Sequence, residues 1–191
     1  VMVKPVGAVC NLACDYCYYL EKANLYKDNP KHVMSDELLE KFIDEYINSQ
    51  TMPQVLFTWH GGETLMRPLS FYKKAMELQK KYARGRTIDN CIQTNGTMLT
   101  DEWCEFFREN NWLVGVSIDG PQEFHDEYRK NNDREREDEN RVEQFEFTLF
   151  FRSVSVFAFF FVPGTEQGFR RDLAGGGDMD RIFFRFRCRR D

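Results

Sequence analysis

The most informative stretch of this sequence is Cys10-Asn11-Leu12-Ala13-Cys14-Asp15-Tyr16-Cys17, which places three cysteines within eight residues. Thiolates at the spacing C-x3-C-x2-C either converge on one inorganic centre or form a strained local bridge. A structural zinc site takes four ligands, usually as two pairs, and no fourth Cys or His lies near these three cysteines to complete a second pair. A cubane 4Fe–4S cluster normally takes four cysteines, so three would leave one iron open to a ligand that is not protein. The loop therefore predicts a reactive metal centre.

Length and composition indicate one soluble globular domain. The 191 residues are 42% hydrophobic and 30% charged, which is enough for a real core. The net charge of −5 gives no support for a nucleic-acid partner. No early apolar run is long enough for a signal peptide or a membrane span, so we expect no membrane partner and a cytoplasmic location. Six cysteines without a secretion signal favour a reducing compartment and metal or redox use.

Strand and helix patterns alternate along the first two thirds of the chain. Ser35, Ser70 and Thr100 are expected as helix N-caps, each before apolar residues at helical spacing. The expected strands lie at 1–9, 55–59, 87–94 and 113–118, and a short helical piece lies at 121–130. This rhythm predicts an α/β fold with a parallel sheet and helices packed outside it.

Parallel sheets bind ligands beyond the carboxyl ends of their strands. Four polar segments follow the expected strands directly. They are the cysteine loop, Gly61-Gly62-Glu63, Gln93-Thr94-Asn95-Gly96 and Ser117-Ile118-Asp119-Gly120. We therefore expect all four to face one crevice.

The composition changes near residue 131. No lysine follows Lys130, and twelve of the eighteen phenylalanines lie in residues 131–191. No convincing periodicity is present there. We therefore treat 131–191 as an uncertain continuation of the fold, with doubtful residue identities.

The motifs of residues 1–130 resemble those of radical S-adenosylmethionine (SAM) enzymes. The shared pattern is C-x3-C-x2-C after a first strand, an aromatic residue before the last cysteine, and Gly-Gly-Glu after the second strand. The amino-acid sequences of residues 4–19, 57–63 and 115–121 resemble those of the anaerobic sulfatase-maturating enzymes. The resemblance covers about residues 1–130 and does not extend into 131–191.

The resemblance implies a partial (β/α)6 radical SAM barrel, which we expect to be incomplete here. It also implies a 4Fe–4S cluster whose open iron binds SAM through the amino and carboxylate groups. One electron from the reduced cluster would split SAM into methionine and a 5′-deoxyadenosyl radical. In this family the radical takes a hydrogen from Cβ of a cysteine or serine in a sulfatase, and oxidation gives Cα-formylglycine. The implied partners are a sulfatase polypeptide or peptide and an electron donor of flavodoxin or ferredoxin type.

The resemblance also assigns roles in the cysteine loop. Cys10, Cys14 and Cys17 would bind three irons as thiolates, against the alternative of three inert buried thiols. Tyr16 would offer its backbone or ring to the adenine, against the alternative of loop packing.

Five further residues are predicted to bind the SAM cofactor. Gly61 and Gly62 would allow close backbone approach to the ligand, although two glycines also suit an ordinary strand-end turn. Glu63 would accept from the ligand ammonium, or be merely solvated. Ser117 would contact the ribose or the methionine part. Arg129 would pair with the methionine carboxylate, or be a solvated charge.

The chain departs from the family pattern in two ways. Family members are longer and carry a C-terminal domain with two further iron–sulfur clusters, whereas only Cys188 follows residue 104 here. We therefore expect the auxiliary-cluster domain to be absent and the chain to be an N-terminal fragment or an incompletely read protein. The catalytic aspartate proposed for the family lies outside the matching region, so the catalytic residue is unknown.

Two alternatives stay open from the sequence. The first is a radical SAM maturase of another peptide, forming thioether or carbon–carbon crosslinks. The second is a zinc-binding interaction module that uses the same cysteines.

Overall fold

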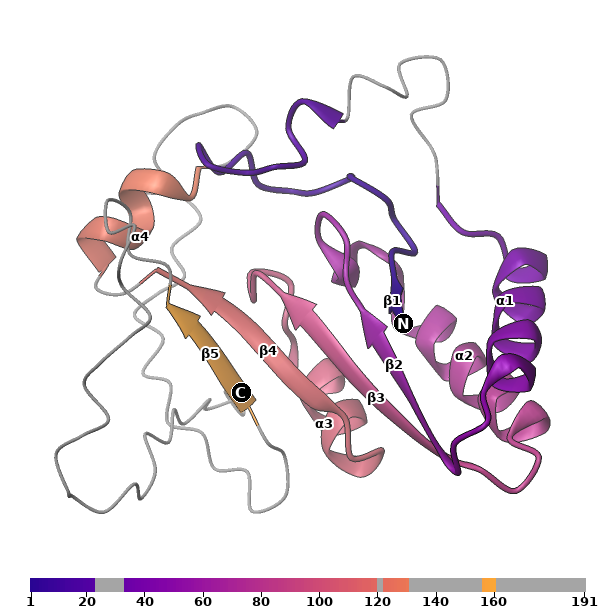
Figure 1. Cartoon of the computed structure of the whole chain (residues 1–191). Helices are drawn as coiled ribbons and strands as arrows, with labels where there is room; N and C mark the ends of the chain where they lie inside the picture. The colour runs from indigo at the N-terminus through magenta and orange to yellow at the C-terminus, as the bar shows by residue number, and fades with distance from the viewer. Residues whose placement is uncertain (23–32, 120–121, 131–155, 161–191) are drawn as a thin grey trace, which may run out of the picture.

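The computed structural model describes residues 1–22, 33–119, 122–130 and 156–160, with the backbone alone for 122–124 and 156–160. Its centre is a five-stranded sheet in which the strand order follows the chain order. The strands are β1 (Met2–Val3), β2 (Gln54–Trp59), β3 (Thr87–Thr94), β4 (Leu113–Ile118) and β5 (Val156–Phe160). All four adjacent pairs are parallel, so the arrows in Figure 1 point the same way. The predicted α/β fold with a partial barrel of parallel strands is confirmed.

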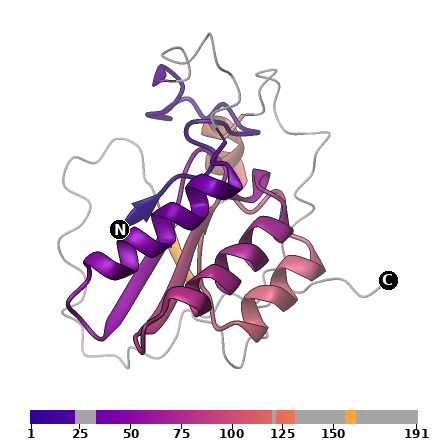
Figure 2. The same ribbon diagram turned by 90° about the vertical axis from the view of Figure 1, so that its right-hand side faces the viewer.

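Three helices cover one face of this sheet, as Figure 2 shows: α1 (Asp36–Ser49), α2 (Leu69–Tyr82) and α3 (Asp101–Glu109). The short helix α4 (Gln122–Tyr128) follows β4, and the 3-10 helix η2 (Thr64–Met66) follows β2. None of the helices in the described ranges is long and apolar enough to cross a membrane.

Aromatic rings fill the layer between the sheet and these helices. Trp59 of β2 stacks on Trp112 with ring centroids 6.2 Å apart, and Tyr72 of α2 meets Trp59 edge-on at 5.5 Å. Trp59 donates its indole N–H to the buried Asn90 at 2.8 Å, which satisfies both polar groups. The ring layer gives the sheet a rigid backing, which fixes the positions of the strand ends.

Two of the three predicted N-caps are confirmed. Ser35 Oγ accepts from Leu38 N at 3.2 Å, and Thr100 Oγ1 accepts from Trp103 N at 3.4 Å. The prediction for Ser70 is wrong, because the N-cap position of α2 is Pro68, two residues earlier, and has no side-chain cap. Proline at φ −65° supplies the extended entry to the helix without a cap hydroxyl.

The first strand is shorter than the predicted range 1–9. It ends at Val3, and the chain then turns through hydrogen bonds from Gly7 N to Lys4 O and from Val9 N to Val6 O. Gly7 has a φ of +59°, which is left-handed backbone that breaks a strand. The turn carries the chain over the end of β2 and starts the cysteine loop there.

Candidate functional site

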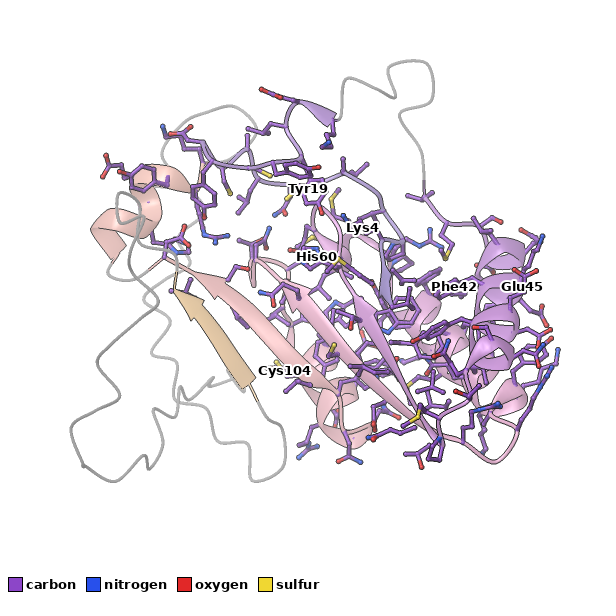
Figure 3. All side chains as sticks on the ribbon, viewed as in Figure 1. Lys4, Tyr19, Phe42, Glu45, His60 and Cys104 are labelled. Carbon is purple, nitrogen blue, oxygen red and sulfur yellow. The ribbon has the colours of Figure 1, made fainter. Side chains whose placement is uncertain are left out.

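The cysteine loop lies beyond the carboxyl ends of the strands, at the upper edge of the sheet in Figure 1. Cys14 is buried, whereas Cys10 and Cys17 are half-buried. The loop tightens through a hydrogen bond of 2.8 Å from Cys17 N to Cys14 O. In contrast, Cys104 lies on α3 away from this edge, as Figure 3 shows. The predicted grouping of the three loop cysteines at the strand ends is therefore observed.

The three thiols are close enough to affect one another. Burial raises the pKa of Cys14 to about 11, with smaller increases from Cys10 and Cys17, while the charge of Arg129 acts in the opposite direction. Burial also raises the pKa of Cys10. The metal-free loop therefore favours neutral thiols, and a cationic metal centre would be needed to stabilise the thiolates.

The described residues contain no group of three or more His, Cys, Asp or Glu that could hold one metal ion. The loop thiols therefore do not form a ready site for a single metal ion. A cubane cluster fits this arrangement, because each cysteine then binds a different iron.

The end of α4 anchors the cysteine loop through the backbone. Ala13 N donates to Lys130 O at 2.7 Å, and Asp15 N donates to Tyr128 O at 2.9 Å. Lys130 and Asp15 also form an ion pair at 2.6 Å. The loop therefore has a fixed position relative to β4 and α4.

A second anchor lies at the beginning of the loop. Lys4 donates to the hydroxyl of Tyr19, and its ammonium lies 4.4 Å from the ring centroid. Figure 3 shows these two side chains near His60, at the end of β2. The segments before and after the cysteines are thus joined.

The Gly61-Gly62-Glu63 segment binds the chain just before the cysteines. Gly62 N donates to Gly7 O, and Glu63 N donates to Val9 O, both at 2.9 Å. A Cβ at Gly62 would lie 2.1 Å from Val9 O, so only glycine fits there. The close approach that Gly62 allows is to protein backbone, and the predicted approach of the two glycines to a ligand stays a prediction.

Glu63 is completely buried and organises the end of β3. Its carboxylate accepts from Leu65 N at 2.9 Å, Thr94 Oγ1 at 2.7 Å and Asn95 N at 2.7 Å. Burial raises the pKa of Glu63, although these donors offset part of the increase. The structure gives Glu63 a supporting role for β3, and its predicted contact with a ligand ammonium stays a prediction.

Arg129 is not a solvated charge. It is 8% exposed and forms a two-point ion pair with Asp119, through Nε at 2.8 Å and Nη2 at 2.9 Å. Burial acts to lower the pKa of Arg129, but the hydrogen bonds and charge of Asp119 raise it overall. Tyr16 donates its hydroxyl to the same carboxylate, and burial together with this bond raises the pKa of Tyr16. Asp119 therefore joins the cysteine loop, β4 and α4.

Ser117 lies on the inner face of β4, at the end of the strand. Gln93 Nε2 donates to Ser117 Oγ at 2.8 Å. The Gln93 side chain crosses Gly115, where a Cβ would lie 2.2 Å from Gln93 Oε1. Ser117 is half-buried, and its predicted contact with the ribose or the methionine part of SAM stays a prediction.

Asn95 connects β3 to the cysteine loop. Its Nδ2 donates to Asn11 Oδ1 at 2.9 Å and reaches Cys10 Sγ at 3.8 Å. Asn11 Nδ2 donates to Thr97 Oγ1 at 2.7 Å, which in turn donates to Asn95 Oδ1 at 2.8 Å. The three side chains thus form a closed ring of hydrogen bonds beside Cys10.

Sequence reasoning placed the four strand-end segments correctly but assigned no role to Asp119, Asn11 or Thr97. Asp119 follows a predicted strand, and that position was the available signal. Its partner Arg129 is ten residues away, and Tyr16 is 103 residues away.

Comparisons with known proteins agree with this geometry. A family model described as the Radical SAM superfamily matches residues 5–146. Over 131 residues the chain is 98% identical to a serine-type anaerobic sulfatase-maturating enzyme of Bacteroides thetaiotaomicron, a match that covers 69% of this chain and 32% of the relative. It is 37% identical over 132 residues to a cysteine-type anaerobic sulfatase-maturating enzyme of Clostridium perfringens, covering 69% of this chain and 35% of the relative.

Solved structures give the same result. Native anSMEcpe with bound AdoMet matches at a TM-score of 0.64 and 36% identity, covering 71% of this chain and 37% of that chain. Native anSMEcpe with bound AdoMet and Cp18Cys peptide matches at 0.63 and 36% identity, covering 72% of this chain and 36% of that chain. The chain spans about a third of the length of these relatives.

Proposed function

Because this chain belongs to the radical SAM superfamily, we propose that Cys10, Cys14 and Cys17 hold three irons of a 4Fe–4S cluster whose fourth iron binds SAM. When both are bound, the reduced cluster would supply one electron to the sulfonium of SAM, and cleavage of the S–C5′ bond would give methionine and a 5′-deoxyadenosyl radical. The observation that carries the proposal is the loop of three neighbouring thiols over the strand ends, anchored by backbone hydrogen bonds at Ala13 and Asp15.

We assign the contacts to SAM to residues around this loop. Ser117 binds the ribose or the methionine part with its hydroxyl, and Tyr16 packs against the adenine, where its bond to Asp119 fixes the ring. Arg129 faces the methionine carboxylate with Nη1, the nitrogen that Asp119 does not bind. Glu63 uses its remaining acceptor position for the ammonium, and Gly61 and Gly62 keep the backbone close to the ligand.

The proposed reaction is the oxidation of a serine or cysteine of a sulfatase to Cα-formylglycine. The relative at 98% identity is serine-type, which favours serine. For serine, the radical takes one hydrogen atom from Cβ and becomes 5′-deoxyadenosine. The substrate radical then passes one electron to an oxidised iron–sulfur cluster and its hydroxyl proton to water, which leaves the aldehyde. A flavodoxin or ferredoxin would supply the electron that cleaves SAM, and we place the reaction in the cytoplasm.

The test is anaerobic reconstitution of the full chain, followed by assays for iron, sulfide and 5′-deoxyadenosine. We expect reductive cleavage of SAM by the wild type and by Cys91→Ala, which changes a cysteine of β3 outside the loop. We expect none from the Cys10→Ala/Cys14→Ala/Cys17→Ala variant. Iron-loaded wild type that releases no 5′-deoxyadenosine in the presence of reductant would contradict the proposal.

A peptide assay separates the remaining alternatives. Sulfatase-derived peptides carrying serine, cysteine or alanine at the target position are incubated with the loaded protein and weighed by mass spectrometry. A serine peptide that loses two hydrogen atoms and reacts with a hydrazide supports formylglycine formation. Crosslinked peptide without an aldehyde indicates another maturase. Stoichiometric zinc without iron or sulfide indicates the interaction module.

A further inference from the structure

We propose that Asn95 is a positioning residue whose amide donates an N–H···S hydrogen bond to Cys10 and thereby raises the reduction potential of the cluster. The inference rests on the proposed function, because it requires the cluster to be bound at the loop. It concerns a residue that directly follows the carboxyl end of β3 and acts through Cys10.

The orientation of the Asn95 amide is fixed by its neighbours. Its Oδ1 accepts from the backbone N of Thr97 at 3.0 Å and from the Thr97 hydroxyl at 2.8 Å. A backbone N–H can only donate, so its partner must be the amide oxygen. The NH2 group therefore faces the other way, toward Asn11 Oδ1 and Cys10 Sγ.

The amide is also held in place on both sides. Asn95 N donates to the buried Glu63 carboxylate at 2.7 Å, which fixes the residue at the end of β3. The ring through Asn11 and Thr97 holds the side chain against the loop. The Nδ2–Sγ distance of 3.8 Å lies within reach of sulfur, whose radius is larger than that of oxygen.

Cys10 has a second donor from the backbone, because Leu12 N lies 3.4 Å from its Sγ. Hydrogen bonds to ligating sulfurs stabilise the reduced and more negative form of an iron–sulfur cluster, and so raise its potential. The N–H donors at Cys10, from the backbone and from Asn95, would make the first reduction step easier for the protein's electron donor. A substitution of Asn95 removes the side-chain donor and leaves the Leu12 backbone donor in place.

The experiment measures the potential of the reconstituted full chain by a redox titration followed by electron paramagnetic resonance. The cluster with an open iron is identified by the change of its signal when SAM is added. Asn95→Ala is expected to reduce the ratio of reduced to oxidised cluster at a fixed applied potential by about two- to tenfold, the effect of one lost hydrogen bond. Thr97→Val is expected to lower the reduction potential by less than Asn95→Ala. It removes the hydroxyl that donates to Asn95 Oδ1, so the Asn95 amide is held less firmly, but the amide keeps its N–H groups.

Two further variants control for charge and for folding. Asn48→Ala changes an exposed asparagine of α1 that binds Arg84, and should leave the potential unchanged. Asn95→Asp keeps the oxygen that Thr97 binds and replaces the NH2 group by oxygen. It should lower the potential further than Asn95→Ala, because the new charge opposes reduction.

The outcomes separate this inference from the proposed function. A wild type that takes up no iron and sulfide would defeat the proposed function. A wild type that loads, together with an equally loaded Asn95→Ala of unchanged potential, would defeat the inference alone. Loss of iron from both Asn95 variants would also defeat it, since Asn95 would then only support the loop.

Discussion

At the scale of single residues, the ion pair between Arg129 and Asp119 carries the largest stability effect expected near the site. Both side chains are buried, with a nitrogen–oxygen distance of 2.8 Å. Asp119→Ala would leave the guanidinium buried without its partner, which costs about 3 to 5 kcal/mol. Urea denaturation of the metal-free chain measures this loss.

The chain offers a matched control at the same distance. Asp44 and Arg84 also lie 2.8 Å apart, but they are exposed on α1 and beyond α2. Asp44→Ala should cost no more than about 1 kcal/mol. Similar losses from the two substitutions would show that burial of Arg129 has no energetic consequence.

Substitution of Gly62 tests the contact between the Gly61-Gly62-Glu63 segment and the chain that leads into the cysteine loop. Gly62→Ala places a methyl group 2.1 Å from Val9 O, so the loop must move. We expect most of the iron binding to be lost on reconstitution. In Gly61→Ala the nearest atoms lie at 3.1 and 3.3 Å, and iron binding should largely persist. Iron contents that do not differ would mean that the loop tolerates displacement.

The buried side chain of His60 should make the stability of the fold depend on pH. Burial lowers the pKa of His60 below its ordinary value of 6.5. Below pH 6.5 the unfolded chain therefore binds a proton at this position more readily than the folded chain, and stability falls as the pH is lowered. His60→Gln should reduce the loss of unfolding free energy between about pH 7 and pH 5. If His60→Gln and the wild type lost the same unfolding free energy between these two pH values, His60 would be excluded as a source of the pH dependence.

At the scale of elements, the helix caps provide a paired test. Ser35→Ala removes the cap of α1, whose Oγ accepts from Leu38 N, and should cost about 1 kcal/mol. Ser70→Ala changes a serine inside the first turn of α2, which has no side-chain cap, and should change stability little. Thermal denaturation distinguishes the two variants. A larger loss from Ser70→Ala would mean that α2 begins at a different residue.

Most elements could be predicted from local patterns. The strands at 87–94 and 113–118 have the predicted bounds because each is followed directly by a turn signal, Asn95-Gly96 or Asp119-Gly120. The early end of β1 could not be predicted, because it depends on a left-handed Gly7 and on docking against Gly62. The helix η2 was also not predicted, since its cap is the Glu63 carboxylate.

At the scale of the whole molecule, the cluster should stabilise regions far apart in the sequence. The amides of Ala13 and Asp15 donate to carbonyls at the end of α4. A group that binds the folded loop alone slows its opening, so these two amides should exchange more slowly after cluster loading. Hydrogen exchange with mass spectrometry measures this. Amides of α1, such as Ile43, serve as the control, and an equal change in both regions would contradict a local effect.

The arrangement of the site could be predicted only in part from the sequence. The rule that parallel strands end at one edge placed Asn95 beside Cys10, Gly62 beside Gly7 and Ser117 beside Gln93, and hydrogen bonds join each of these pairs. The rule does not specify which polar side chains pair with each other. Asp119 was therefore not identified as the partner of Tyr16 and Arg129, because that pairing depends on where α4 packs.

The long-range anchors of the cysteine loop have a consequence for biosynthesis. Asp15 leaves the ribosome 115 residues before its ion-pair partner Lys130. Because the strand order follows the chain order, each new strand can add to the nascent sheet as it emerges. The cysteine loop nevertheless gains its hydrogen bonds to Tyr128 and Lys130 only after β4 and α4 have been synthesised. Delivery of iron and sulfide during translation would therefore be productive only after most of this region has been synthesised.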